Sequence, residues 1–193
     1  MEEIFILTVQ SPYRYDKRKK GDILMDDNNL VLIGFMGVGK TTVGELLADR
    51  LQREFLDMDR VIEKETGRTI PDIFAAEGEV AFREIEKRIT IDYCRNTKKN
   101  ILSLGGGAYM QPEIREACLK ECTVIFLDIS WEQWLERMEE LKEGRPLLQE
   151  KSLEEIQKLF DSRHDTYRHC THHVLTDRTT PEEVTEIIME KMS

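Results

Sequence analysis

The stretch Gly34-Phe35-Met36-Gly37-Val38-Gly39-Lys40-Thr41 follows a short apolar run and precedes an amphipathic segment. Its G-x-x-x-x-G-K-T spacing is typical of a phosphate-binding loop that joins a strand to a helix. Glycines let successive backbone N–H groups point at phosphate oxygens, and the helix adds the positive end of its dipole. We expect Lys40 to reach the β- and γ-phosphates of a nucleotide and the Thr41 hydroxyl to ligate Mg²⁺. The nucleotide contacts expected from this loop and its helix are Gly37, Val38, Gly39, Lys40, Thr41 and Thr42.

On both sides of this loop, short apolar runs alternate with longer amphipathic segments. Such alternation predicts an α/β fold in which a parallel sheet with right-handed crossovers is sandwiched between two layers of helices. The expected strands are residues 30–35, 55–59, 101–104, 123–129 and 173–176. The expected helices are residues 41–52, 112–120, 131–140, 152–167 and 181–192, and helical segments are expected over about residues 61–96.

Three helix starts carry the capping-box spacing, in which a hydroxyl residue is followed three positions later by Glu or Gln. The pairs are Ser130 with Gln133, Ser152 with Glu155, and Thr180 with Glu183. Residues 141–151, between two expected helices, are polar and contain glycine. We expect this segment to be a mobile lid.

Two acidic residues, Asp57 and Asp59, end the second expected strand. Side chains two positions apart on a strand point the same way, and the carboxyl ends of parallel strands face the ligand crevice. One carboxylate can order water on Mg²⁺, and the other can accept a proton from a hydroxyl that attacks the γ-phosphoryl group. The alternative interpretation is that both residues cap the next helix.

Two further features favour a small anionic acceptor. Gly105-Gly106-Gly107 ends the third expected strand, and three consecutive glycines allow the backbone to approach a ligand closely. Arg83 lies three positions before Glu86 on an expected helix, so the carboxylate can hold the guanidinium for a bidentate grip on an anion. The simpler alternatives are a tight turn and a surface ion pair.

Composition limits the partners of the chain. Its 193 residues suit one domain, and 28 Lys and Arg against 38 Asp and Glu give a net charge of −10, which disfavours nucleic acid and anionic membranes. The four cysteines lack paired C-x-x-C spacing and no apolar run is long enough to span a membrane, so we expect a cytoplasmic protein with reduced thiols. Residues 1–25 show no period, and we expect a flexible extension before a domain at 26–193.

A histidine-rich stretch near the last expected strand raises the alternative of a zinc site. It contains His164, His169, His172 and His173 together with Cys170. Adjacent side chains diverge along a strand, and no second set of ligands has a closing spacing. We therefore expect Mg²⁺ and no zinc.

In combination, these motifs resemble the shikimate kinase family. The resemblance runs from about residue 30 to the C-terminus and rests on D-x-D at 57–59, F-R-x-x-E at 82–86, G-G-G-A at 105–108 and R-P-L-L at 145–148. It implies a fold like that of the nucleoside monophosphate kinases, with a five-stranded parallel sheet, a helical substrate region and a lid. It also implies ATP-dependent phosphorylation of the 3-hydroxyl of shikimate with Mg²⁺, and we expect a monomer.

The resemblance also assigns roles to individual residues. Asp59 matches the aspartate that binds the shikimate hydroxyls and is a candidate base, and Asp57 matches the one near Mg²⁺. The groups matching those around the shikimate carboxylate and ring are Arg83, Arg163, Gly105, Gly106 and Gly107. Arg145 matches a lid arginine over the phosphates, and Arg137 and Arg178 match positions near the nucleotide base. Catalysis is expected from Lys40, Asp59 and Arg145.

Two other functions stay open at this point. A nucleotide-dependent switch is disfavoured because the sequence has no N-K-x-D stretch for reading guanine, and a switch has no use for an acceptor site. A kinase of gluconate or of a nucleotide shares the phosphate-binding loop. Two arginines beside three glycines favour a carboxylate acceptor over these.

Overall fold

A computed structural model describes residues 27–140 and 152–192. The extension expected at residues 1–25 and the lid expected at 141–151 lie outside the described residues. No helix in the described ranges is long and apolar enough to cross a membrane.

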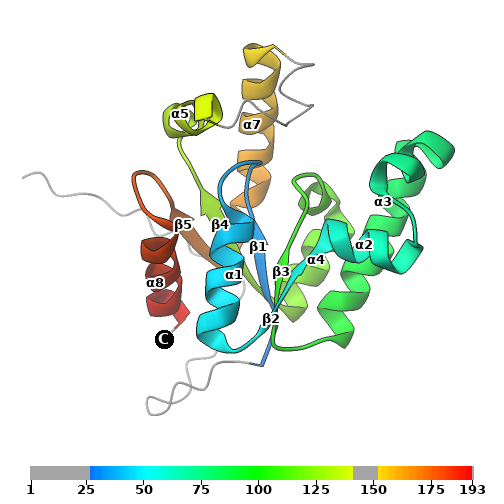
Figure 1. The fold of residues 1–193 in the computed structure, drawn as a ribbon, viewed down its shortest axis with the longest axis horizontal. Coiled ribbons are helices and arrows are strands. Elements are labelled where there is room, and N and C mark those ends of the chain that lie inside the picture. Colours follow the sequence, from blue (N-terminus) through cyan, green and yellow to red (C-terminus); the bar gives the residue numbers. More distant parts are fainter. Residues whose placement is uncertain (1–26, 141–151, 193) are drawn as a thin grey trace, which may run out of the picture.

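Within the described residues, five parallel strands form a sheet in the order β2-β3-β1-β4-β5 (Figure 1). The strands are β1 (Leu30–Ile33), β2 (Glu54–Asp57), β3 (Asn100–Ser103), β4 (Thr123–Asp128) and β5 (His172–Leu175). The helices are α1 (Lys40–Leu51), α2 (Met58–Thr66), α3 (Ile70–Asn96), η1 (Ala108–Met110, a 3₁₀ turn), α4 (Pro112–Glu121), α5 (Trp131–Glu140), α7 (Leu153–Tyr167) and α8 (Pro181–Met192). The predicted five-stranded parallel α/β fold is confirmed.

Strand β1 lies at the centre of the sheet, and its side chains divide between the two faces. Val31 and Ile33 pack with the core side chains of α2, α3 and α4. Leu30 and Leu32 pack with those of α1, α5, α7 and α8. All four are at most 3% exposed, which explains why the run is apolar throughout rather than alternating. The result is a three-layer sandwich, with the phosphate-binding loop at the carboxyl end of its central strand (Figure 1).

The prediction that the second strand extends to residue 59 was wrong. β2 stops at Asp57, and α2 begins at the next residue, so Asp59 lies in the first turn of a helix. Asp57 is the N-cap of this helix, because its Oδ1 accepts from the backbone N–H groups of Asp59 at 3.0 Å and Arg60 at 3.4 Å. The two carboxylates therefore come from different elements and do not share a strand face.

The helical segments expected over residues 61–96 are α2 and α3. Helix α2 ends at Thr66 and is capped by Gly67, whose φ of 64° is left-handed. Thr69 caps the start of α3 by accepting from the Asp72 N–H. Within α3, Gly78 has φ 79° and ψ 176°, which interrupts the helix one residue before Glu79.

The three predicted helix caps differ in detail. Ser152 and Glu155 exchange both capping-box hydrogen bonds, as do Thr180 and Glu183. At the start of α5 only the Ser130 hydroxyl half is present, because the Ser130 N–H donates to Asp177 Oδ1 at 2.8 Å instead. This contact ties α5 to the loop after β5.

Helix α1 packs closely on the sheet at Gly44. A Cβ there would lie 2.3 Å from Cε2 of Phe55 and 3.1 Å from Cδ1 of Leu32. We expect Gly44→Ala to lower the free energy of unfolding by about 1–3 kcal/mol, because core side chains must shift. Alanine has a more favourable helix propensity than glycine by about 1 kcal/mol, and this gain opposes the cost of shifting the core side chains. Urea unfolding followed by circular dichroism measures the effect.

The exposed neighbour provides the control for this prediction. Glu45→Ala is expected to stay within about 0.5 kcal/mol of the wild type. Equal stability of the two variants would contradict the close packing at Gly44.

Candidate active site

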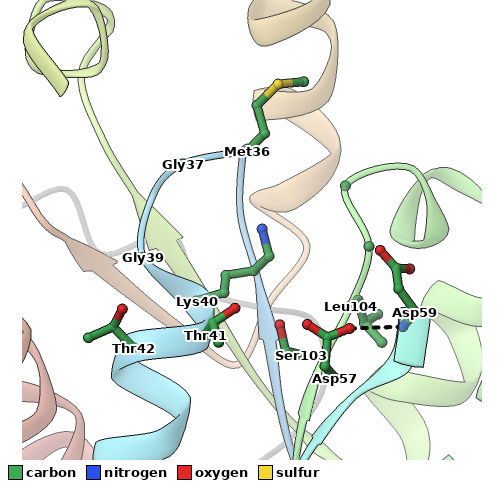
Figure 2. A pocket seen from close by; sticks show the side chains of 12 residues that line it. Met36, Gly37, Gly39, Lys40, Thr41, Thr42, Asp57, Asp59, Ser103 and Leu104 are labelled. Atoms are coloured by element: carbon green, nitrogen blue, oxygen red, sulfur yellow. Dashed lines mark hydrogen bonds between the residues drawn. The ribbon is translucent and has the colours of Figure 1, made fainter. Parts of the chain in front are cut away.

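The phosphate-binding loop curls over the carboxyl end of β1. Gly34 has φ 148°, and a Cβ there would lie 2.4 Å from the carbonyl oxygen of Leu127 on β4, so only glycine fits. Gly39, at φ 101°, leads into α1. The Lys40 ammonium donates to the carbonyls of Gly34 at 2.8 Å and Phe35 at 3.3 Å, and thus lies across the loop (Figure 2).

Helix α5 holds this loop from outside. The Trp134 indole Nε1–H donates to the Met36 carbonyl at 2.8 Å. Arg137, expected near the nucleotide base, donates to the carbonyls of Val38 at 3.1 Å and Thr176 at 2.9 Å. The contacts with Met36 and Val38 fix the backbone of the phosphate-binding loop, and the contact with Thr176 ties α5 to the segment after β5.

A cavity of about 370 Å³ lies beside the loop (Figure 2). It is lined by Met36, Gly37, Gly39, Lys40, Thr41, Thr42, Asp57, Asp59, Ser103, Leu104, Gly105 and Gly106. Nine of these positions were expected from the sequence, whereas Ser103 was missed. Ser103 ends β3, directly beside Asp57 in the sheet register, and no short motif marks it. The cavity thus brings an ammonium, two carboxylates and hydroxyl groups to one place.

A second cavity, of about 490 Å³, lies on the other side of the loop. It is lined by Val38, Gly39, Thr42, Val43, Arg137, Thr176, Thr179, Pro181 and Val184. Arg178 was also expected near the nucleotide base. It is exposed and is not among the described residues that line this cavity. Arg145 lies outside the described residues.

Asp59 lines the first cavity and is exposed to solvent there. Its pKa is raised from the ordinary value, chiefly by partial desolvation at the cavity wall and secondarily by the neighbouring Asp57 carboxylate. Lys40 and Arg83 act in the opposite direction but do not outweigh this desolvation. A carboxylate with a raised pKa is a stronger base than an ordinary aspartate, which suits proton acceptance.

The triple glycine was expected to admit a ligand, and the structure shows that it admits charged side chains. A Cβ at Gly105 would lie 2.7 Å from Asp59 Oδ1, and one at Gly106 would lie 2.9 Å from an Arg163 terminal nitrogen. A Cβ at Gly107 would lie 3.0 Å from both terminal nitrogens of Arg83. The three glycines therefore bring one carboxylate and two guanidinium groups to a single stretch of backbone.

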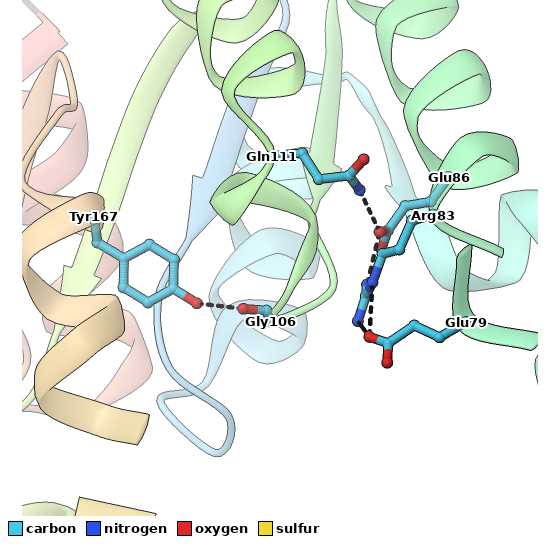
Figure 3. A network of polar contacts seen from close by, with 6 residues as sticks. All are labelled: Glu79, Arg83, Glu86, Gly106, Gln111 and Tyr167. Atoms are coloured by element: carbon cyan, nitrogen blue, oxygen red, sulfur yellow. Dashed lines mark hydrogen bonds and ion pairs between the residues drawn. The ribbon is translucent and has the colours of Figure 1, made fainter. Parts of the chain in front are cut away.

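Arg83 is held between two carboxylates of α3, as the i, i+3 spacing predicted for one of them. Its Nη1 donates to Glu86 Oε2 at 2.7 Å, and its Nη2 lies 3.2 Å from Glu79 Oε1 (Figure 3). Glu86 is 3% exposed and Glu79 is 67% exposed. The buried pair therefore dominates the orientation of the guanidinium.

Arg163 reaches the same place from α7. Its guanidinium lies 5.7 Å from the centre of the Phe35 ring. Burial lowers its pKa, and the positive charge of Arg83 lowers it further. Tyr167, one helical turn later, donates its hydroxyl to the Gly106 carbonyl at 2.8 Å (Figure 3). Two partly buried cations side by side favour an anion between them.

The histidine-rich stretch forms a different arrangement from a zinc site. His164 and His173 each place Nε2 against Asp128 Oδ2, at 3.1 Å and 2.7 Å. Burial raises the pKa of Asp128, but these contacts outweigh burial and lower it. Among the described residues, no three His, Cys, Asp or Glu side chains are arranged to hold a metal.

The fold and the site define a class of protein. A phosphate-binding loop, a basic carboxylate and two arginines meet at one edge of a parallel sheet, which is the arrangement of a P-loop kinase that phosphorylates a small anionic molecule.

Comparison with known proteins identifies the family. The family model for shikimate kinase matches residues 36–193, and the chain belongs to the shikimate kinase family. A shikimate kinase of Bacillus pumilus is 47% identical over 171 residues, covering 89% of this chain and 92% of the relative. The solved structure of a shikimate kinase from Acinetobacter baumannii in complex with shikimate is 38% identical, with a TM-score of 0.76, and covers 86% of this chain and 93% of that chain.

A gluconokinase from Sinorhizobium meliloti is more distant. It is 15% identical, with a TM-score of 0.52, over 86% of this chain and 91% of that chain. This likeness is one of fold alone.

Proposed function

We propose that the chain transfers the γ-phosphoryl group of ATP to the 3-hydroxyl of shikimate, giving shikimate 3-phosphate and ADP. The observation that carries this proposal is the contact of Asp59, Arg163 and Arg83 with the three successive glycines beside the phosphate-binding loop. A ring that bears both hydroxyl groups and a carboxylate matches a site with a base at one end and two cations at the other.

The nucleotide is proposed to place its phosphates in the loop between Gly34 and Thr41. Backbone N–H groups and the start of α1 would stabilise the phosphate charge, and Lys40 would move from the Gly34 carbonyl to the β- and γ-phosphates. The adenosine part would occupy the second cavity, beside Arg137 and Pro181. Arg145 is proposed to add positive charge over the phosphates.

The residues around the first cavity suit Mg²⁺. Thr41 and Ser103 supply hydroxyl oxygens and Asp57 a carboxylate, and Mg²⁺ prefers oxygen ligands together with water. We propose that Thr41 and Asp57 hold the ion, which would neutralise charge on the phosphates when bound. Asp57 Oδ1 accepts from two backbone N–H groups, and this fixes the orientation of the carboxylate.

Asp59 is proposed to accept the proton of the attacking hydroxyl. Its raised pKa means that the active, deprotonated form is lost as the pH falls through a value above the ordinary aspartate range. Arg83 and Arg163 would bind the shikimate carboxylate and so fix the ring, which leaves positioning and charge stabilisation as the main sources of rate enhancement.

A coupled assay of ADP release tests the proposal. Shikimate, gluconate, a nucleoside monophosphate and no acceptor are compared at saturating ATP and Mg²⁺. Of these four conditions, only the one that contains shikimate is expected to give turnover. Folded protein that binds ATP but gives no shikimate-dependent turnover would overturn the acceptor assignment and leave the nucleotide site standing. Omission of Mg²⁺ with excess chelator is expected to abolish turnover.

The close approach of Gly105 to Asp59 gives a further prediction. Gly105→Ala places a methyl group where only 2.7 Å separates it from Asp59 Oδ1, so the carboxylate must move. A displaced base is expected to lower kcat about tenfold or more, with little change in the shikimate KM. The matched variant Gly106→Ala displaces Arg163 instead, and is expected to raise the shikimate KM more than it lowers kcat. Identical kinetic effects of the two variants would contradict separate roles.

We further propose a monomer that works in the cytoplasm, in the biosynthesis of chorismate and the aromatic amino acids. The four cysteines are free thiols, as suits a reducing compartment. The net charge of −10 argues against nucleic acid as a partner. Light scattering during size-exclusion chromatography is expected to give the mass of one chain.

A further inference from the structure

Gln111 lies where the turn after the triple glycine enters α4, and its side chain reaches the carboxylate that holds Arg83. Its Nε2 donates to Glu86 Oε2 at 2.7 Å, and Arg83 Nη1 donates to the same oxygen at 2.7 Å (Figure 3). The Gln111 backbone N–H donates to the Ala108 carbonyl at 3.1 Å. The residue thus joins the turn that follows the triple glycine to α3, the helix from which Arg83 projects.

Glu86 is a buried carboxylate that depends on its donors. It is 3% exposed, and burial raises its pKa, with the Asp59 charge acting in the same direction. Arg83 and Gln111 oppose this by hydrogen bonding to the ionised form. If Glu86 became protonated, the negative charge that fixes the Arg83 guanidinium would be lost. The contact of Arg83 with Glu79 is more exposed and longer, and is a weaker restraint.

We propose that Gln111 is a positioning residue for the acceptor: its amide fixes the Glu86 carboxylate, which orients Arg83 for the carboxylate of the acceptor. Gln111 acts through Glu86 rather than through the reacting atoms. The proposal rests on the proposed function, because the affinity that it controls is that for shikimate. Arg83 is about one-third exposed and projects from a long helix, so its orientation needs such support.

Two substitutions with opposite pH responses test this role. Gln111→Leu removes the donor, and the shikimate KM is expected to rise about five- to tenfold with kcat and the ATP KM unchanged. Because the pKa of Glu86 rises further, the fall of kcat/KM for shikimate on acidification should begin at a higher pH than in the wild type. Gln111→Glu places a second carboxyl group against Glu86, and this new group can donate a hydrogen bond to Glu86 only when it is protonated. The shikimate KM of Gln111→Glu should therefore fall relative to that of Gln111→Leu as the pH is lowered.

Arg115→Gln is the matched control on the same helix. Arg115 donates to the carbonyls of Tyr109 at 3.2 Å and Met110 at 3.4 Å, so it supports the same turn without contacting Glu86. This variant is expected to keep the wild-type shikimate KM and pH profile even where its melting temperature falls. An equal rise in KM for Arg115→Gln, or a wild-type KM for Gln111→Leu across the pH range, would overturn the positioning role. Absence of shikimate turnover by the wild type would overturn the proposed function, and this proposal with it.

Discussion

Replacement of Asp59 by Asn is expected to lower kcat about 100-fold or more, while the affinity for ATP stays close to that of the wild type. The amide keeps the shape of the side chain but cannot accept the proton of the attacking hydroxyl, and loss of a general base costs about 10²–10⁴ in rate. Steady-state kinetics gives kcat, and calorimetric titration with a non-hydrolysable ATP analogue gives the affinity. Full activity would remove Asp59 from this role.

The same substitution is expected to stabilise the fold near neutral pH. The pKa of Asp59 is raised in the folded state, so its ionised form is better solvated in the unfolded chain. A group of this kind favours folding at low pH, and the contribution is lost as the pH rises through the folded-state pKa. The asparagine of Asp59→Asn does not ionise, so the variant does not lose stability in this way as the pH rises. The melting temperature of the variant should therefore exceed that of the wild type at pH 7. Asp49→Asn, on the exposed side of α1, is the control for both measurements and should match the wild type.

Replacement of Arg83 by Ala is expected to raise the shikimate KM about 10–100-fold, with a smaller effect on kcat. The guanidinium would form charge-assisted hydrogen bonds with the acceptor carboxylate, and each such bond contributes about 1.5–3 kcal/mol. Steady-state kinetics with shikimate and ATP varied separately measures the two KM values. An effect confined to ATP would mean that Arg83 does not bind the acceptor.

Arg83→Lys separates charge from geometry in this experiment. Lysine keeps a positive charge opposite the buried Glu86 but lacks the planar fork that can hold Glu86 and a carboxylate together. Its shikimate KM is expected to lie between those of the wild type and Arg83→Ala. A wild-type KM for the lysine variant would show that charge alone is sufficient.

The sheet and the phosphate-binding loop were predictable because their signals are local. The apolar run of β1 and the glycine spacing after it are each contained within a dozen residues, and the fold follows from their alternation with helices. Asp57 and Asp59 show the limit of this reasoning. A strand and a helix N-terminus both suit this short stretch, and the cap formed by Asp57 decided in favour of the helix.

The candidate site was predictable where partners lie one helical turn apart. The pair of Arg83 and Glu86 follows from i, i+3 spacing, whereas the contact of Glu86 with Gln111 spans 25 positions and depends on how α3 and α4 pack. The triple glycine was correctly placed at the sheet edge, but its partners belong to α2, α3 and α7. No local pattern records that a missing Cβ makes room for a side chain from another helix.

The position of α5 makes intrinsic tryptophan fluorescence a probe of the phosphate-binding loop. Trp131 and Trp134 are the two tryptophans of the sequence, their rings are stacked 4.9 Å apart, and the second donates to the Met36 carbonyl of the phosphate-binding loop. All indole fluorescence therefore originates beside the phosphate-binding loop. Occupancy of the loop can be followed by tryptophan emission without an attached dye, and stopped-flow mixing can time nucleotide arrival separately from phosphoryl transfer.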